Sequence, residues 1–250
     1  MDASANGDAI LAVEDLFAGY DKLTVLNGTS FRAARGAITT IIGPNGAGKS
    51  TLFKAVFGLL PVRGGRVVLD GREITNSSPR RLLELGICYV PQGRNLFPEL
   101  SVRHNLELGA TAAGAGIDVG ARIESLMERF PMLRERAGSQ ASTLSGGQQK
   151  LLEIARGLLL EPKLMLIDEP SIGLSPLLVR EIFDLLHELR GKGVSILMVE
   201  QNAKRALEIS DYGVVLELWR TRLAGAAAAI LADARVGQLF LGGGLAAGTA

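Results

Sequence analysis

The chain has 250 residues, and its 27 lysines and arginines nearly balance its 26 aspartates and glutamates. Apolar residues make up 47% of the sequence and charged residues 21%, a composition that excludes a disordered chain. The formal net charge of +1 gives no overall electrostatic reason to bind nucleic acid, and we expect no nucleic-acid partner.

Two features argue against secretion and membrane insertion. Residues 1–8 are polar and carry no lysine or arginine, so they lack the regions of a signal peptide. The longest apolar candidates, such as residues 223–232, are rich in alanine and shorter than the ~20 residues of a membrane helix. The single Cys88 cannot form an internal disulfide, and its apolar neighbours predict a small buried side chain. We expect a soluble or peripheral protein that contacts a membrane only through a partner.

The first part of the chain predicts an antiparallel β patch. Short apolar runs at 10–13, 25–33 and 66–69 are separated by turn residues, including Asn27-Gly28 and Asp70-Gly71. Further on, predicted strands alternate with helical patterns, which indicates a mostly parallel sheet with helices packed on it. These predicted strands span residues 38–42, 87–90, 164–167 and 194–199.

Two helices have strong patterns of one buried stripe. The first follows Gly147, with apolar residues at Leu151, Ile154, Ala155, Leu158 and Leu159. The second follows Pro176 and stops at Gly191, with apolar residues at Leu178, Ile182, Leu185, Leu186 and Leu189. Between residues 101 and 140 the strand signal is weak and helical windows such as 121–130 occur, so we expect a helical insertion in the α/β core.

A phosphate-binding motif follows the predicted strand at 38–42. The residues are Gly43, Pro44, Asn45, Gly46, Ala47, Gly48, Lys49 and Ser50, which fit G-x-x-x-x-G-K-[ST]. A helix-like segment at 52–60 comes next, so backbone amides and the positive helix end would both face phosphate oxygens. Lys49 would reach the β- and γ-phosphates, Ser50 would offer its hydroxyl to Mg²⁺, and Thr51 completes the predicted set. The alternative is a glycine-rich strand-to-helix turn without a ligand.

The predicted strand at 164–167 ends in two acidic residues, Asp168 and Glu169. Beside a phosphate loop, Asp168 is placed to hold Mg²⁺, and Glu169 to orient or deprotonate the attacking water. The alternative is a solvated strand end. A hydroxyl, a carboxylate and phosphate oxygens are hard ligands, which favours Mg²⁺. The chain lacks the Asn-Lys-x-Asp motif expected of a GTPase.

The string Leu144-Ser145-Gly146-Gly147-Gln148 precedes the first amphipathic helix. With it the chain resembles the ATP-binding cassette family, whose signature motif has these five residues upstream of the second acidic strand. The amides of Ser145, Gly146 and Gly147 at a helix N-terminus offer a second anion site. The plain alternative is a helix N-cap formed by Ser145.

The resemblance spans residues 9–240 and implies roles for two further residues. Tyr20 matches the aromatic residue that stacks on adenine, against the alternative of an ordinary core or surface tyrosine. Gln92 matches the glutamine that touches Mg²⁺ and the attacking water, against a plain loop amide. The implied fold is α/β, a P-loop NTPase of cassette type with a mostly parallel core sheet, an antiparallel β subdomain and a helical subdomain. We expect one domain, with the core at 9–90 and 160–240, the helical subdomain at about 95–158, and a flexible tail at 241–250.

In this family two cassettes face each other head to tail, and each ATP lies between one chain's phosphate loop and the other chain's signature motif. One chain of this length holds one copy of each half-site, so hydrolysis implies a dimer. The resemblance therefore implies an ATPase that uses ATP and Mg²⁺.

Two positions depart from the common family pattern. Gln201 stands where the family usually has a histidine that contacts the γ-phosphate, and it donates a hydrogen bond but carries no charge. Ser175 stands where many members have aspartate. We expect a weaker contact at Gln201 and altered communication across the dimer.

With these two residues, the chain resembles the ATPases of branched-chain amino acid uptake systems. The resembling strings are residues 91–94, 168–176 and 199–202. The resemblance implies a different sister cassette, two membrane permease subunits, an extracytoplasmic substrate-binding protein and a place on the cytoplasmic face of the cell membrane. A urea or amide importer and a soluble assembly scaffold, as in iron–sulfur cluster assembly, remain alternatives. Residues 218–222 replace a common Asn-Gly hairpin turn, and Trp219 either covers the sheet edge there or accompanies a distorted hairpin.

Overall fold

The computed structural model describes residues 9–93, 95–111 and 118–240. The expected tail at 241–250, the polar start at 1–8 and Arg94 lie outside the described residues. Within the described part of the chain, no helix combines the length and apolar character that a membrane crossing requires.

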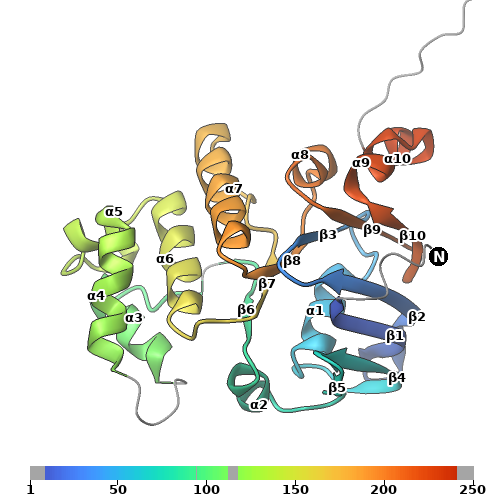
Figure 1. Ribbon diagram of the computed structural model, residues 1–250, viewed down its shortest axis with the longest axis horizontal. Coiled ribbons are helices and arrows are strands. Elements are labelled where there is room, and N and C mark those ends of the chain that lie inside the picture. The colour runs from blue at the N-terminus through green and yellow to red at the C-terminus, as the bar shows by residue number, and fades with distance from the viewer. Residues whose placement is uncertain (1–8, 94, 112–117, 241–250) are drawn as a thin grey trace, which may run out of the picture.

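Two sheets form the framework (Figure 1). The first is antiparallel and has the order β2-β1-β4-β5, made of β1 (Ala9–Tyr20), β2 (Leu23–Ala34), β4 (Val62–Leu69) and β5 (Arg72–Glu73). The second has the order β10-β9-β3-β8-β7-β6 and is parallel except for the β9–β10 pair. Its strands are β3 (Ile38–Ile42), β6 (Ile87–Val90), β7 (Leu164–Asp168), β8 (Ser195–Val199), β9 (Tyr212–Glu217) and β10 (Arg220–Ala226). The expected mostly parallel core and its antiparallel neighbour are both confirmed.

One of the two expected turns in the antiparallel sheet is wrong. Asp70 and Gly71 do form the turn between β4 and β5, with φ angles of +53° and +76°. Asn27-Gly28 instead lies inside β2, where the register against β1 shifts and Gly28 has a φ of +74°. Gly28 is an extra residue in a β-bulge, so the positive φ that a glycine allows bends a strand here and does not end it.

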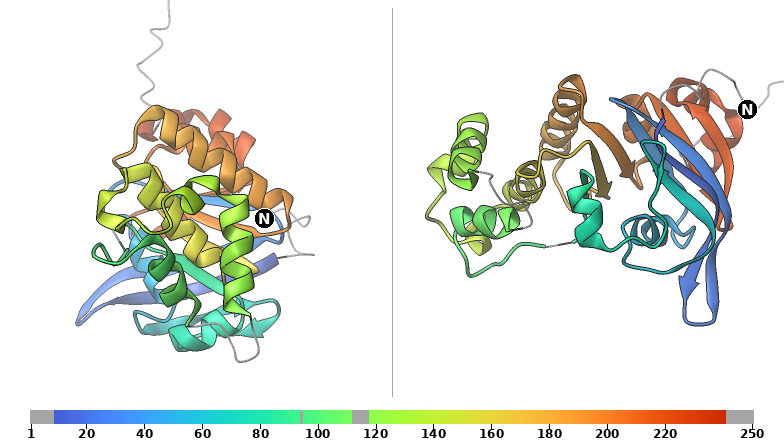
Figure 2. Two further views of the ribbon diagram at one scale, coloured as in Figure 1. Left: turned by 90° about the vertical axis from the view of Figure 1, so that its left-hand side faces the viewer. Right: turned by 60° about the horizontal axis from the view of Figure 1, so that its bottom comes forward.

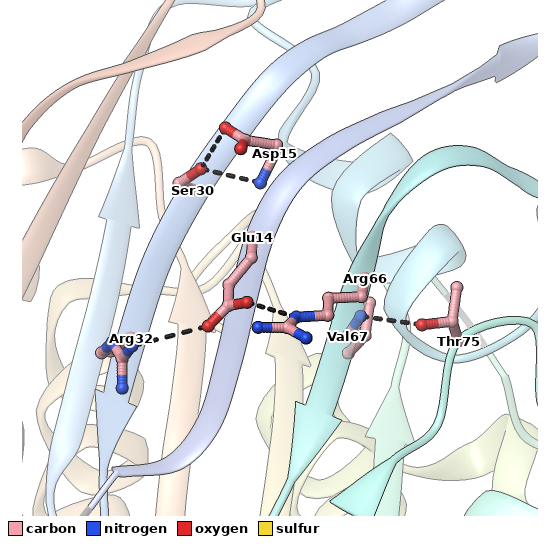
Figure 3. A network of polar contacts seen from close by, with 7 residues as sticks. All are labelled: Glu14, Asp15, Ser30, Arg32, Arg66, Val67 and Thr75. Carbon is pink, nitrogen blue, oxygen red and sulfur yellow. Dashed lines mark hydrogen bonds and ion pairs between the residues drawn. The ribbon is translucent and has the colours of Figure 1, made fainter.

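A polar network lies on the antiparallel sheet (Figure 3). The Glu14 carboxylate on β1 accepts hydrogen bonds from Arg66 on β4 and, at 3.5 Å, from Arg32 on β2. Ser30 accepts from the Asp15 amide at 2.8 Å, beside the bend where the β1–β2 register shifts. Such exposed contacts contribute little stability, and their effect is to favour one pairing register among three strands.

The helices fall into separate layers (Figures 1 and 2). α6 and α7 lie between the sheets and the group of α3, α4 and α5, as the right-hand view of Figure 2 shows. The helices are α1 (Lys49–Val56), α2 (Pro79–Glu84), α3 (Val102–Ala110), α4 (Val119–Arg129), α5 (Pro131–Glu135), α6 (Gly146–Leu158), α7 (Pro176–Gly191), α8 (Ala203–Glu208), α9 (Ala227–Ala232) and α10 (Ala234–Phe240), with a 3-10 turn at Ala141–Thr143. The predicted helical insertion corresponds to α3, α4 and α5.

The central strands are buried on both faces, as expected for a parallel sheet covered on two sides. On β7, Met165 and Ile167 pack with the helical layer, whereas Leu164 and Leu166 pack toward α1 and the antiparallel sheet. The predicted helical stripes are buried except at their first members, Leu151 and Leu178, which stay partly exposed. Cys88 is buried as expected, and burial raises the pKa of its thiol to about 12.

Candidate functional site

The loop from β3 to α1 contains the predicted phosphate motif, and two of its glycines are dictated by space and backbone shape. A Cβ at Gly43 would lie 2.4 Å from the Leu216 carbonyl oxygen on β9, so only glycine fits beside that strand. Gly48, immediately before α1, has a φ of +97°. This left-handed residue turns the chain so that the first amides of α1 point into the loop.

Lys49 begins α1 and turns back over the loop. Its Nζ donates hydrogen bonds to the Gly43 carbonyl at 2.8 Å and to the Pro44 carbonyl at 3.2 Å. The side chain is buried, and this burial lowers the pKa of the ammonium, while the nearby charges of Glu169 and Asp168 oppose the shift. A buried cation facing two acids is suited to meet the negative charge of phosphate oxygens.

Asp168 is the last residue of β7 and is buried. Burial raises the pKa of its carboxyl, and hydrogen bonds from Ser50 and Tyr89 oppose that shift. Oδ2 accepts a hydrogen bond from the Tyr89 hydroxyl at 3.3 Å, whereas Oδ1 is buried with no hydrogen-bond partner. This unpartnered carboxylate oxygen and the Ser50 hydroxyl, which contacts the same carboxyl group, are hard ligands that fit a Mg²⁺ ion.

Such an ion would need ligands from the nucleotide as well. The described residues contain no group of three or more His, Cys, Asp or Glu side chains that could hold a metal alone. Mg²⁺ is commonly bound by one or two protein oxygens together with phosphate oxygens and water. Asp168 and Ser50 match that pattern.

Glu169 follows β7 in a left-handed conformation with a φ of +49°. Its amide donates to the Val199 carbonyl at 2.9 Å, and its Oε2 accepts a hydrogen bond from Gln92 Nε2 at 2.8 Å. Burial is the first cause that raises the pKa of this carboxyl, and the charge of Asp168 is the second. A carboxylate with a raised pKa is a better proton acceptor than an exposed one.

Gln201 approaches the same place from the segment after β8. Its Nε2 donates to Asn45 Oδ1 at 3.2 Å, which links it to the phosphate loop. A cavity of about 340 Å³ lies between these elements. It is lined by Val25, Asn45, Gly46, Gly48, Lys49, Ser50, Thr51, Gln92, Glu169 and Gln201. All but Val25 belong to the set predicted from the sequence.

The predicted residues Gly43, Pro44, Ala47 and Asp168 are not part of this lining, and neither are Tyr20 and the string 145–148. Tyr20, at the end of β1, is 42% exposed, and its hydroxyl accepts a hydrogen bond from Lys54 of α1 at 3.4 Å. The string 145–148 lies at the start of α6. In Figure 1, α7 lies between α6 and α1, the helix that follows the phosphate loop. Ser145 Oγ accepts from the Gln148 amide at 3.3 Å, and Gln148 Oε1 accepts from the Ser145 amide at 3.0 Å. This capping box fixes the start of α6, which contributes no residue to the cavity at the chain's own phosphate loop.

Sequence reasoning gave no role to Glu200, the acid just after β8. It is 1% exposed, and its carboxylate accepts the Ser171 amide at 2.9 Å, the Ser171 hydroxyl at 2.8 Å and the Gln201 amide at 3.1 Å. The loop after Glu169 and the segment of Gln201 are thus tied to one carboxylate. A charged residue directly after the apolar run 196–199 was the available signal.

Ser175 has a local function as the N-cap of α7. Its hydroxyl accepts a hydrogen bond from the Leu178 amide at 3.4 Å, and Pro176 follows at the first helical position.

Sequence reasoning also missed the hydrogen bond that the Tyr89 hydroxyl donates to Asp168. Tyr89 lies on β6, which pairs with β7, so its partly buried hydroxyl reaches Asp168 through that strand pairing and not through any motif.

The fold and the site together define a P-loop ATPase of cassette type. The family model for ABC transporters matches residues 26–172, and the chain belongs to this family as an ATP-hydrolysing subunit.

Relatives of known name match along almost the whole chain. The high-affinity branched-chain amino acid transport ATP-binding protein BraG of Pseudomonas aeruginosa is 37% identical, over 94% of this chain and 100% of the relative. The probable branched-chain amino acid transport ATP-binding protein LivF of Archaeoglobus fulgidus is 39% identical, over 93% of this chain and 99% of the relative. Among solved structures, MJ1267, an ATP-binding cassette of an ABC transporter, superimposes with a TM-score of 0.85 at 30% identity, covering 94% of this chain and 99% of that one. That protein has also been solved in an ADP conformation, which matches with a TM-score of 0.82.

Proposed function

We propose that this chain is the ATP-hydrolysing motor subunit of an importer for branched-chain amino acids. The observation that carries the ATPase part is the cavity where Lys49, Glu169 and Gln201 meet. The substrate class rests on the relatives BraG and LivF, whose similarity extends over nearly the full chain and whose names state branched-chain amino acid transport.

In the proposed reaction, ATP and water give ADP and phosphate. Glu169 accepts a hydrogen bond from Gln92, which leaves its other oxygen to orient the attacking water and take its proton. Lys49 stabilises charge that develops on the phosphate oxygens, and Gln201 donates a hydrogen bond to the γ-phosphate. Mg²⁺, held by Ser50 and Asp168 with Gln92 nearby, would neutralise phosphate charge. Tyr20 stacks on the adenine.

The proposed working unit is a head-to-tail pair of cassettes. The start of α6 does not line the chain's own cavity, and its Gly146 and Gly147 amides would meet the nucleotide of the partner. The Ser145 amide would join them on release from its hydrogen bond to Gln148. A sister cassette is the proposed partner, with residues 9–240 acting as one ATPase domain. ATP binding closes the pair, and hydrolysis opens it.

The membrane subunits are proposed to dock near Gln92 and the helical insertion. A contact supports this choice, because Glu153 of α6 accepts the Asn95 amide at 2.8 Å. A movement at Asn95 would therefore be transmitted to α6. The first residues of α6 are the ones proposed to contact the partner's nucleotide. The complex is proposed to lie on the cytoplasmic face of the cell membrane, with two permease subunits and an extracytoplasmic binding protein.

Gentle detergent extraction of membranes, followed by purification of the chain and identification of its partners, tests this proposal. We expect a second cassette and two permease subunits, and uptake of labelled leucine that is lost when the chain is deleted. Uptake of labelled urea that depends on the chain would indicate an amide importer. Recovery of the chain without any membrane subunit would favour the scaffold alternative and contradict the transport role.

A further inference from the structure

The turn between β9 and β10 is built from two bulky residues in an unusual backbone conformation. Leu218 and Trp219 have φ angles of +47° and +67°, and β9 pairs with β10 from Glu217 and Arg220 onward. A two-residue hairpin turn with both φ angles positive favours asparagine and glycine, because a large side chain is strained there. The hairpin therefore forms, with one register shift farther along β10 between Thr221 and Leu223, and backbone strain lies in its turn. Strain of this kind persists only where the surroundings hold it.

The β2 strand holds the turn in place. The Trp219 carbonyl accepts hydrogen bonds from the Asn27 amide and from the Thr29 hydroxyl, each at 3.0 Å. Both donors flank the bulge at Gly28. The antiparallel sheet thus fixes the position of Trp219 relative to the core.

The indole of Trp219 contacts the phosphate loop. Its Nε1–H donates a hydrogen bond to the Gly46 carbonyl at 3.1 Å. Gly46 is exposed and has a φ of +81°. Because glycine has no side chain, its own structure does little to restrict its backbone conformation. The peptide bond from Gly46 to Ala47 is planar, so a fixed Gly46 oxygen also fixes the direction of the Ala47 amide. That amide donates to the Pro44 carbonyl at 3.1 Å.

We propose that Trp219 is a positioning residue for the phosphate loop. Its indole holds the Gly46–Ala47 peptide in the orientation in which the amides of the loop enclose phosphate. This inference rests on the proposed role of residues 43–51 in nucleotide binding. Because the indole is neutral and acts on the loop, it affects bound ADP and ATP alike. Loss of such uniform binding raises the KM for ATP and leaves kcat unchanged.

Three variants of the full chain separate positioning from folding. Trp219→Phe keeps an aromatic ring and removes the donor. The double variant Leu218→Asn/Trp219→Gly supplies the residues that this turn favours and removes both the strain and the indole. Leu218→Asn alone changes the same turn and keeps the indole, so it is the matched control. Each variant is measured by calorimetric titration with Mg-ADP and by thermal unfolding.

We expect Trp219→Phe and the double variant to bind Mg-ADP about three- to tenfold more weakly, the range of one lost hydrogen bond. Leu218→Asn should keep the wild-type affinity. The Tm of the double variant should equal or exceed that of the wild type, so affinity and stability change in opposite directions. In the assembled transporter, the KM for ATP should rise by the same factor in Trp219→Phe while kcat stays constant.

Trp219 is the single tryptophan of the chain, so its fluorescence reports on this contact without interference. We expect the wild-type emission to change when Mg-ADP saturates the chain. Wild-type affinity in both Trp219 variants, or an affinity loss that only follows a fall in Tm, would overturn the inference, as would an unchanged emission spectrum. A wild-type chain that binds no Mg-ADP would instead contradict the phosphate loop itself.

Discussion

Ser171 donates both its amide and its hydroxyl to the buried carboxylate of Glu200, at 2.9 and 2.8 Å. The same carboxylate accepts the amide of Gln201. Farther along the loop from Ser171, Leu174 lies against Gly146 at the start of α6. Glu200 therefore connects two parts of the proposed site. One is Gln201, which is proposed to touch the γ-phosphate, and the other is the loop that packs on α6, the helix proposed to face the partner. Burial raises the pKa of Glu200, and its hydrogen bonds oppose that shift.

The first prediction concerns this connection. Glu200→Ala leaves the amides of Ser171 and Gln201 without their acceptor, and we expect it to lower the free energy of unfolding by about 1–3 kcal/mol. Hydrolysis should fall as well, because Gln201 and the loop after Glu169 lose their common support. Urea unfolding and ATPase assays of the cassette pair measure the two effects.

Glu181→Ala, which removes an exposed carboxylate on α7, is the control and should change neither quantity. Glu200→Gln keeps one oxygen for Ser171 but turns an amide group toward the other donors, so its effect should lie between those of wild type and Glu200→Ala. A fully active and fully stable Glu200→Ala variant would contradict the connection.

Much of the site was predictable because its signals are local in sequence. The strand at 38–42, the motif of residues 43–50 and the acids after β7 occur within short segments, and each segment has one geometry that suits its residues. Parallel strands bring such segments to the same edge of a sheet. The sequence thus predicted which residues would meet without predicting any distance.

The remaining features depend on pairing between distant segments. Asn27-Gly28 has the local signal of a turn, but β2 pairs with β1 on both sides of it, and the pairing energy of the long strand turns the same two residues into a bulge. Glu200 meets Ser171 only because β7 and β8 are neighbours. Trp219 reaches Gly46 because β9 lies beside β3. None of these contacts has a spacing that a motif could reveal.

The second prediction tests the proposed role of Glu169 as general base. Glu169→Gln keeps the shape of the side chain and an oxygen for Gln92, so ATP binding should persist and the cassette pair should accumulate in a closed, ATP-bound form. The amide accepts no proton from water, and we expect kcat to fall by about a hundredfold or more. Single-turnover assays and size-exclusion chromatography with Mg-ATP check both points. Unchanged hydrolysis would remove Glu169 from this role.

The third prediction is a pH dependence of stability in the same variant. The folded-state pKa of Glu169 lies above its ordinary value of 4.5, so the ionised carboxylate is less favourable in the folded than in the unfolded chain. This cost is complete above the raised pKa and disappears below 4.5, where both states are protonated. Glu169→Gln should therefore have a higher Tm than wild type at neutral pH, and the difference should shrink as the pH falls toward 4.5. A difference that grows on acidification would show the opposite sign of the pKa shift.

The fourth prediction concerns Lys49. Lys49→Ala removes the buried cation that caps the loop carbonyls, and nucleotide affinity should fall at least about tenfold, as for a lost charged hydrogen bond. Lys192→Ala, at the exposed end of α7, removes the same charge from the chain and should bind nucleotide normally. Titration of each variant with Mg-ATP provides the comparison. Normal binding by Lys49→Ala would make the phosphate-loop interpretation wrong.

The last prediction addresses the residue that replaces the usual histidine. Gln201 donates to Asn45 at 3.2 Å, and an imidazole of similar reach retains a donor for the γ-phosphate while adding a group that titrates near pH 6.5. Gln201→His should therefore preserve or raise the ATPase activity of the cassette pair, with a new rise in activity as the pH falls toward that value. Gln201→Ala, which has no donor, serves as the control and should lose activity. Near-total loss in Gln201→His would show that the amide itself is required, and not merely an uncharged hydrogen-bond donor.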